Sequence, residues 1–450
     1  MKFSKYVLLG KNINDKTFIF NTFYKTCYLI SEKEADIIKQ AIENNDIKQL
    51  DNGLKQKLIS ANDIIDESTN ESELVDYDFC KLAYTDDTLD LTIITTNACN
   101  FKCVYCYQKY KPEIITEENA EKIIKFIDRE TDFCKTLIIN WFGGEPLLTI
   151  DTIINMSQKI IDITRKKKIT YLARMTTNGY LLTPEVFSKL LKLHIYTYLI
   201  TIDSTEEKHN LQRPLQNGQG TYKTIFNNLL EIKKIKKNFI LDIRYNITTY
   251  NLSDIDTFID TMNGYFSDDK RFSVVFESIQ DWKGSRIKDH MDLLLNNEYI
   301  INNVYTIASK RGINLQSYLK YQHQVQMCPA IKKRGYTISF DASVHKCEMA
   351  MHDPVFKDVN KIGQIDENGI LSIVKENEAR WITRRQNLDQ CYDCICYPYC
   401  MGGAQCNFGM KFHYHTRCQD KIAYMERTAA LISLQPNCTN LSDIQFDKIK

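Results

Sequence analysis

Three cysteines lie close together in the sequence, at Cys99, Cys103 and Cys106. Thiolates at spacings of four and three residues can wrap around one soft metal centre. A structural zinc ion would need four protein ligands, and no fourth cysteine or histidine lies nearby. An iron–sulfur cluster tolerates three thiolates when its last iron takes a different ligand. The spacing therefore favours a cluster with one iron open to a substrate over three buried thiols brought together by chance.

The order of these cysteines is C-x3-C-x2-C, and an aromatic residue, Tyr105, stands just before the third. This segment resembles the signature of the radical S-adenosylmethionine (SAM) superfamily. The resemblance implies a [4Fe–4S] cluster whose free iron is chelated by the amino and carboxylate groups of SAM. It also implies that one electron breaks a carbon–sulfur bond of SAM, and that the resulting 5′-deoxyadenosyl radical removes hydrogen from a substrate.

A second motif, Gly143-Gly144-Glu145-Pro146, directly follows a predicted strand. Glycines let a backbone approach a ligand closely, and a carboxylate can accept a charge-assisted hydrogen bond from an ammonium group. Without context such a stretch could be an ordinary turn. Behind the cysteine motif it resembles the element of the family that binds the methionine amino group of SAM.

Further polar residues follow other predicted strands. Asn178 and Asp203 resemble positions of the family near the ribose and the substrate, and Arg213 resembles a basic position that could meet the cofactor carboxylate. Each has a plain alternative, because Asn-Gly is a common turn, an aspartate can cap a helix and an arginine can pair on the surface. The catalytic residues stay unassigned, with Glu277 and Asp281 as weak candidates for proton transfer.

A second set of cysteines is concentrated in the C-terminal part, at Cys328, Cys347, Cys391, Cys394, Cys396, Cys400, Cys406 and Cys418. From spacing alone, Cys391-x2-Cys394 with later cysteines could be a zinc ribbon. The set resembles the SPASM domain, which carries auxiliary clusters in many radical SAM enzymes. Two positions depart from that pattern: Ala342 replaces a glycine, and Ala404 stands where a cysteine is expected.

The SPASM resemblance implies two auxiliary [4Fe–4S] clusters, and hence three clusters in the whole chain. One would be held by Cys391, Cys394, Cys400 and Cys418. The other would be held by Cys328, Cys347 and Cys406, either with an open iron or with Cys396 completing it.

Alternating strands and helices position these motifs. Strands are predicted over 91–96, 137–142, 171–176, 196–202, 240–247 and 272–276, and helices over 117–129, 150–164, 184–193, 222–236 and 252–263. Six strand–helix units imply a parallel sheet with helical crossovers. The expected fold is α/β, a partial (β/α)6 TIM barrel with its chemistry at the carboxyl ends of the strands.

The chain is expected to have several units. Residues 1–85 predict three short strands and a helix capped by Ser31, and they resemble a small winged-helix-like, peptide-recognition domain; the plain alternative is an extension that only packs on the body. The barrel would cover 86–285, a helical linker with a long helix over 291–310 would cover 286–326, and the SPASM domain 327–425. The last part, 426–450, would be a tail that is poorly ordered after Leu434.

The composition excludes several classes of protein. The 58 basic and 57 acidic residues give a net charge of +1, which favours neither nucleic acid nor an anionic membrane as a partner. No secretory signal or long apolar run is present, so a cytoplasmic location is expected. There most of the 15 cysteines would be metal ligands rather than disulfides. The exceptions, expected to be ordinary thiols, are Cys27, Cys80, Cys134 and Cys438.

The leading functional hypothesis is a maturase that crosslinks a ribosomally made precursor peptide through a thioether or carbon–carbon bond. Its expected partners are the precursor with its leader and an electron donor such as flavodoxin or ferredoxin. One alternative is a sulfatase-type maturase that makes formylglycine, although residues 1–85 weigh against it. A further alternative is a non-catalytic iron–sulfur electron carrier.

Overall fold

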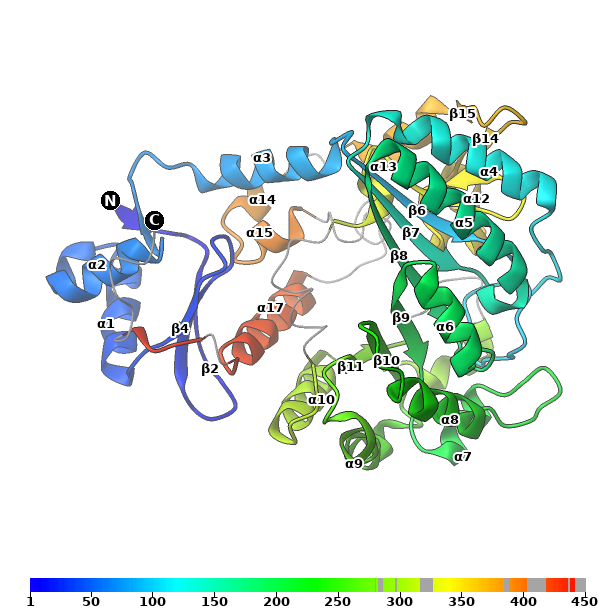
Figure 1. The fold of residues 1–450 in the computed structure, drawn as a ribbon. Coiled ribbons are helices and arrows are strands. Elements are labelled where there is room, and N and C mark those ends of the chain that lie inside the picture. Colours follow the sequence, from blue (N-terminus) through cyan, green and yellow to red (C-terminus); the bar gives the residue numbers. More distant parts are fainter. Residues whose placement is uncertain are drawn as a thin grey trace.

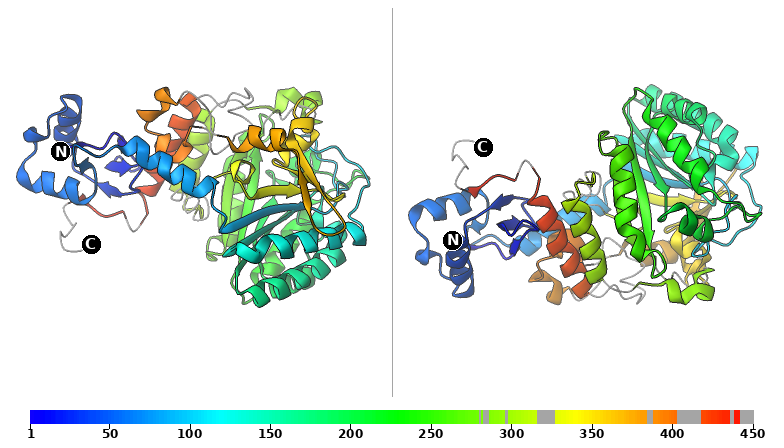
Figure 2. Two further views of the ribbon diagram at one scale, coloured as in Figure 1. Left: turned by 90° about the horizontal axis from the view of Figure 1, so that it is seen from above. Right: turned by 90° about the horizontal axis from the view of Figure 1, so that it is seen from below.

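The computed structural model of the protein describes residues 1–279, 281, 286–295, 298–315, 327–383, 388–402, 418–435 and 438–441. The molecule is elongated, with a small N-terminal unit at one end and the α/β barrel at the other (Figures 1 and 2). In the part of the chain that is described, no helix combines the length and the apolar character needed to cross a membrane.

The central sheet contains six parallel strands in chain order. They are β6 (Thr88–Ile94), β7 (Thr136–Phe142), β8 (Thr170–Thr177), β9 (Ile195–Thr201), β10 (Ile240–Ile247) and β11 (Phe272–Ser278). Each overlaps a strand predicted from the sequence, and each pairs in parallel with its neighbour. The predicted partial barrel of six units is therefore confirmed.

Helices between the strands cover the outer face of this sheet (Figure 1). They are α4 (Glu117–Glu130), α5 (Ile150–Lys167), α6 (Pro184–Lys192), α7 (Glu206–Gln212), α8 (Tyr222–Lys233) and α9 (Ile255–Phe266). Along β7 the residues Leu137, Ile139 and Trp141 are fully buried, while the residues between them are half-buried. This alternation places one face of the strand against the helices and the other inside the barrel.

The C-terminal part extends the same sheet. Strand β12 (Gly335–Ile338) pairs in parallel with β6, and β13 (Ser343–His345), β14 (Lys361–Ile365) and β15 (Leu371–Ile373) continue antiparallel. Ile338, Val344 and Ile362 of these strands join the hydrophobic core of the barrel.

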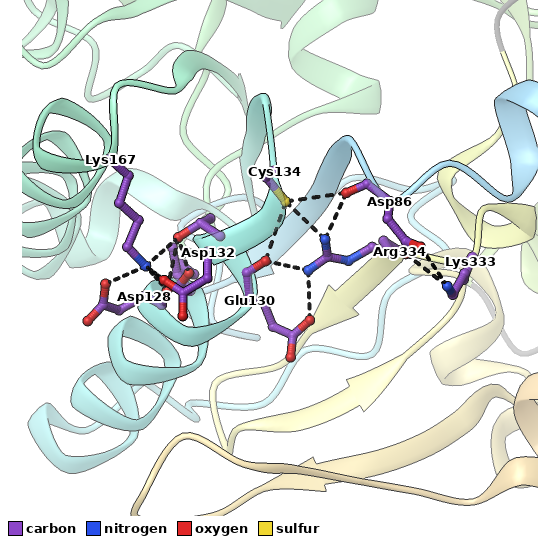
Figure 3. A network of polar contacts seen from close by, with 10 residues as sticks. Asp86, Asp128, Glu130, Asp132, Cys134, Lys167, Lys333 and Arg334 are labelled. Atoms are coloured by element: carbon purple, nitrogen blue, oxygen red, sulfur yellow. Dashed lines mark hydrogen bonds and ion pairs between the residues drawn. The ribbon is translucent and has the colours of Figure 1, made fainter.

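A buried arginine anchors this extension to the barrel (Figure 3). The guanidinium of Arg334 donates to the Asp86 carbonyl (2.9 Å), the Cys134 sulfur (3.0 Å) and the carboxylate and backbone carbonyl of Glu130. The neighbouring Lys333 forms an ion pair with Asp86 (2.8 Å). One side chain thus joins β12 to the end of α4 and the start of β6.

Replacing Arg334 with methionine is expected to lower the free energy of unfolding by about 2 to 3 kcal/mol, because two part-buried carbonyl groups and the Glu130 carboxylate lose their donor. The matched control is Arg129→Met on α4, where the side chain is exposed. Urea unfolding of the two variants measures the difference. Equal stability of both would show that the Arg334 contacts contribute nothing.

The N-terminal unit contains a three-stranded antiparallel sheet of β2 (Val7–Lys11), β3 (Thr17–Asn21) and β4 (Cys27–Leu29). Helix α1 (Glu32–Glu43) begins at Ser31, whose side chain forms a capping box with Glu34 as the sequence indicates. The unit also holds α2 (Asn52–Ser60), the short pair β1 (Lys2–Phe3) and β5 (Ile64–Ile65), and α3 (Glu71–Ala83), which leads to the barrel. Helix α3 was not predicted.

The carboxyl group of Asp63 lies fully buried in this unit, where it accepts a hydrogen bond from the Asn21 amide (3.2 Å). Burial raises the pKa of Asp63 to about 8. Because the pKa of Asp63 is higher in the folded state than in the unfolded state, its neutral form stabilises the fold. This contribution to stability is fully present below the unfolded pKa of about 4 and is lost as the pH rises toward 8.

The Asp63→Asn variant is therefore expected to lose less stability between pH 5 and pH 8 than the wild type, with a difference of about 2 to 4 kcal/mol. Hydrogen exchange of the β3 and β4 amides at both pH values measures this. Asp36→Asn, at an exposed position of α1, is the control. Identical pH profiles for the wild type and Asp63→Asn would contradict the prediction.

The predicted long helix over 291–310 is wrong in its first part. A 3-10 segment η5 (Arg286–Leu293) precedes α10 (Glu298–Lys310), and a non-helical His290 interrupts η5. Helix α10 packs against the C-terminal helix α17 (Cys418–Ile432), which also contacts β2. The remaining helical segments are η1 (Ile47–Gln49), η2 (Thr131–Phe133), η3 (Pro146–Thr149), η4 (Leu252–Asp254), η6 (Pro329–Ile331), η7 (Met349–His352), α12 (Lys357–Asn360), α13 (Lys375–Ile382), α14 (Asp389–Tyr392) and α15 (Tyr397–Cys400).

Candidate active site

The first three cysteines lie in the loop that leaves the carboxyl end of β6. Cys103 is buried, and Cys99 and Cys106 are half-buried. Burial raises the pKa of all three thiols, that of Cys103 to about 11, although the charge of Arg213 acts against this rise. A group that requires thiolates must therefore supply the positive charge that deprotonates them.

The glycine motif is in direct contact with the cysteine loop. The Gly144 N–H donates to the Thr96 carbonyl (2.8 Å), and the Glu145 N–H donates to the Ala98 carbonyl (2.9 Å). A Cβ atom on Gly144 would lie 2.2 Å from the Ala98 oxygen, and one on Gly143 would lie 2.6 Å from the Thr96 oxygen. Only glycines permit this approach, and Gly143 also has a positive φ of 148°.

The Glu145 carboxylate is fully buried and receives hydrogen bonds from protein donors. They are the Leu147 N–H (3.0 Å), the Thr177 hydroxyl (2.6 Å) and the Asn178 N–H (2.7 Å). Burial raises the pKa of Glu145, while these hydrogen bonds act in the opposite direction. The side chain therefore ties the loop after β7 to the loop after β8. This geometry supports a positioning role, and contact with the SAM amino group stays a prediction.

Asn178 is brought beside the first cysteine. Its Nδ2 atom donates to the Asn100 side chain (2.7 Å) and lies 3.9 Å from the Cys99 sulfur. The Asn178 Oδ1 atom accepts from the Tyr180 N–H (3.0 Å), which fixes the orientation of the amide. The turn after β8 therefore lies beside the cysteine motif, and a position of Asn178 near the ribose of a cofactor stays a prediction.

Asp203 and Arg213 meet on the aromatic residue of the cysteine motif. The Tyr105 hydroxyl donates to Asp203 Oδ2 and accepts from Arg213 Nη1 (2.8 Å). Burial raises the pKa of Asp203, and the charge of Arg213 opposes this. Burial by itself would lower the pKa of Arg213, but Cys103, Tyr105 and Asp203 raise it above its ordinary value. The guanidinium is therefore a fixed positive charge beside the cysteine loop.

Two residues of this network were missed by the sequence reasoning. Asn246 donates its side-chain amide to the Tyr105 hydroxyl (3.0 Å) and its backbone N–H to Asp203 (2.9 Å). His209 accepts from the Asp203 N–H at Nδ1 (3.0 Å), so its proton is on Nε2, beside the Thr221 hydroxyl (3.1 Å). The sequence could have indicated Asn246 as a site residue, because it is a polar residue at a barrel-facing position of a buried strand.

The two candidates for proton transfer lie at and beyond the end of the last barrel strand. Glu277 lies near the end of β11 with an exposed side chain, and Asp281 is half-buried beyond it. Their catalytic role stays a prediction.

The second cysteine set is only partly described. Cys406 lies outside the described residues, and Cys418 is the first residue of α17. Cys328 and Cys347 flank the β12–β13 hairpin, whereas Cys391, Cys394, Cys396 and Cys400 lie on and around α14 and α15. The Cys396 thiol donates to Cys394, which lowers the pKa of Cys394 to about 6. Cys396 is thus paired with a residue that the resemblance assigns to the other cluster.

The geometry of the donors bears on which group they can hold. Three thiols on one loop are a soft donor set of the kind that iron–sulfur clusters use. The close approach of Gly143 and Gly144 to this loop leaves their side free of side-chain atoms. The residues present therefore fit a [4Fe–4S] cluster with a small ligand beside it.

The fold and the thiol loop define an α/β partial barrel with three cysteines beyond the carboxyl end of its first strand. Residues 93–262 match the model of the radical SAM superfamily. This match covers the barrel part of the chain and identifies residues 93–262 as a radical SAM domain. The radical SAM family implies SAM and a [4Fe–4S] cluster as cofactors of this domain.

Individual relatives share moderate similarity with the chain. It is 27% identical over 347 residues to the radical SAM cyclopropyl synthase TigE of Paramaledivibacter caminithermalis, covering 69% of this chain and 66% of TigE, just under two thirds. It is 24% identical over 367 residues to the cysteine-type anaerobic sulfatase-maturating enzyme of Clostridium novyi, covering 74% and 93%. A solved structure of anSMEcpe with bound AdoMet and Kp18Cys peptide superposes with a TM-score of 0.58 at 18% identity, covering 77% of this chain and 99% of that one.

Proposed function

We propose that the protein is a maturase that modifies a ribosomally synthesised precursor peptide. The observation that carries this proposal is the position of the N-terminal sheet, which lies against the second cysteine set. The Tyr6 hydroxyl donates to the Tyr392 carbonyl (3.0 Å), and the Thr22 hydroxyl donates to the Ile395 carbonyl (2.7 Å). A leader added to this sheet as a strand would hold its peptide beside the SPASM-like segment.

In this proposal Cys99, Cys103 and Cys106 hold the SAM-binding cluster, and Gly143 and Gly144 let the cofactor approach it. Bound SAM would supply a 5′-deoxyadenosyl radical that removes a hydrogen atom from the peptide. Glu145, Asn178, Asp203 and Arg213 position the loops around it. The C-terminal cysteines would hold two auxiliary clusters. An electron donor such as flavodoxin or ferredoxin would supply the reducing equivalents.

The expected product is a peptide with a thioether or a carbon–carbon bond. Similarity to a cyclopropyl synthase favours the carbon–carbon bond, because a three-membered carbon ring requires one. Formylglycine formation is the second candidate, favoured by the match to a sulfatase-maturating enzyme that covers 93% of that relative.

The test uses the anaerobically reconstituted protein with dithionite, SAM and each short peptide encoded beside its gene. Release of 5′-deoxyadenosine reports SAM cleavage, and tandem mass spectrometry reports the product. A crosslinked peptide without an aldehyde supports the first candidate, and an aldehyde that reacts with a hydrazine reagent supports formylglycine. A protein that leaves SAM intact would refute both and support an electron carrier.

A further inference from the structure

The outer edge of β4 carries an extended segment from the other end of the chain. The Leu29 N–H donates to the Thr439 carbonyl (2.9 Å), and Leu29 forms a parallel bridge with Asn440. This segment follows α17 and reaches the N-terminal unit beside β4 (Figure 1). The prediction of a poorly ordered tail is therefore wrong for residues 438–441. Residues 436–437 and 442–450 lie outside the described residues.

A buried side chain accompanies this backbone pairing. Leu441 is fully buried and belongs to the hydrophobic cluster of the N-terminal unit, together with Ile19, Tyr28 and Ile38. Strand addition to a sheet edge uses two kinds of contact. One is a backbone hydrogen bond to the edge strand, and the other is an apolar side chain buried in a pocket beside it. The segment thus makes the contacts that an extended peptide ligand would make at this edge.

The opposite edge strand of the sheet has a different neighbour. Helix α17 packs against β2, and the Asn12 side chain at the end of β2 donates to the Ser433 hydroxyl (3.0 Å). The β4 edge is therefore the one at which the structure pairs an extended segment.

We propose that the β4 edge is a binding site for an extended peptide with an apolar side chain, and that residues 438–441 occupy it as an internal ligand. This inference rests on the proposed function, in which the external ligand is the precursor leader. The leader must then displace Leu441 from the hydrophobic cluster. The apparent affinity of the leader is reduced in proportion to the fraction of molecules in which the β4 edge is free of the tail.

A pair of cysteines can make this docking sensitive to oxidation. The sulfur atoms of Cys27 on β4 and Cys438 in the tail lie 3.5 Å apart. The contact lowers the pKa of Cys438 and raises that of Cys27, so Cys438 is the thiol that deprotonates first. Its thiolate attacks a low-molecular-weight disulfide, and the resulting mixed disulfide is resolved by Cys27. The sum is two protein thiols and one small disulfide giving one protein disulfide and two small thiols. The tail is then covalently held on the edge.

The test uses the full-length chain and a fluorescent peptide of residues 435–443 with serine in place of Cys438. Leu441→Asp is expected to release the tail, since a buried carboxylate is costly, and to bind the probe about tenfold or more tightly than the wild type. Thr439→Asp adds the same charge at an exposed neighbouring position and is expected to behave as the wild type. Hydrogen exchange at Leu29 should be faster only in Leu441→Asp.

Treatment with a small disulfide should abolish probe binding to the wild type and leave Cys438→Ser unaffected, and mass spectrometry should find the Cys27–Cys438 bond only in the wild type. Equal probe binding by the wild type and Leu441→Asp, or none by Leu441→Asp, would overturn the proposal. Release of 5′-deoxyadenosine by the reconstituted protein with dithionite, SAM and the encoded peptides tests the proposed function separately. Its absence would refute the maturase while leaving the probe measurement intact.

Discussion

Replacing Cys103 with serine is expected to abolish cluster loading at the first site and to lower 5′-deoxyadenosine release by at least about a hundredfold. Cys103 is 9% exposed, and its position is fixed by backbone hydrogen bonds on either side, from the Lys102 N–H to Pro214 (2.8 Å) and from the Val104 N–H to Gln212 (3.0 Å). Serine keeps the size of the side chain, but its oxygen is a hard ligand that soft iron–sulfur chemistry disfavours.

Cys80→Ser is the matched control, because Cys80 lies on α3 with an exposed side chain. Iron content, visible absorption and 5′-deoxyadenosine are measured for both variants after anaerobic reconstitution. In the proposed function the C-terminal cysteines hold further clusters, so the expected loss is partial for iron and nearly complete for SAM cleavage. A Cys103→Ser protein with wild-type SAM cleavage would remove the basis for assigning the cluster to this loop.

Replacing Gly144 with alanine is expected to cause the second large loss, about a hundredfold in 5′-deoxyadenosine release. The added Cβ would lie 2.2 Å from the Ala98 carbonyl oxygen and 2.7 Å from its carbon. Both are backbone atoms next to Cys99, so the two loops must separate by about 1 Å, a misplacement that can cost a hundredfold in rate. The Gly144 N–H bond to Thr96 would be lost with them.

Gly264→Ala is the control for this substitution. Gly264 lies within α9, nothing lies within 4 Å of its added Cβ, and alanine favours a helix. Thermal unfolding and SAM binding are measured alongside activity, which separates a local displacement from general unfolding. Unchanged SAM cleavage by Gly144→Ala would show that the close approach of the two loops is dispensable.

The sequence predicted the barrel well because segments rich in β-branched and aromatic residues alternate with segments of helical periodicity. Strand β10 was predicted with its observed bounds, Ile240–Ile247. The motifs at the ends of β6, β7 and β8 were also placed correctly, since parallel strands bring their carboxyl ends to one edge. These features depend on local patterns that the sequence carries directly.

Long-range features could not be predicted in the same way. The partners of the Glu145 carboxylate lie 32 and 33 residues away, at Thr177 and Asn178, and no local pattern reveals that their donors converge on it. Strand β12 has four residues, too few for a periodic signal, and it forms because β6 offers a free edge. The start of the long predicted helix failed for the opposite reason, since residues 291–293 belong to a 3-10 segment and residues 294–295 are non-helical despite a suitable local pattern.

The parallel pairing of β12 with β6 has a consequence for electron movement. Cys99 follows β6, and Cys328 and Cys347 flank β12 and β13, so one hydrogen-bonded sheet carries thiols from both sets. A sheet does not stretch as a flexible linker does. The distance over which electrons would tunnel between metal groups at these positions would therefore be set by the strand spacing. It would stay constant when the surrounding loops fluctuate.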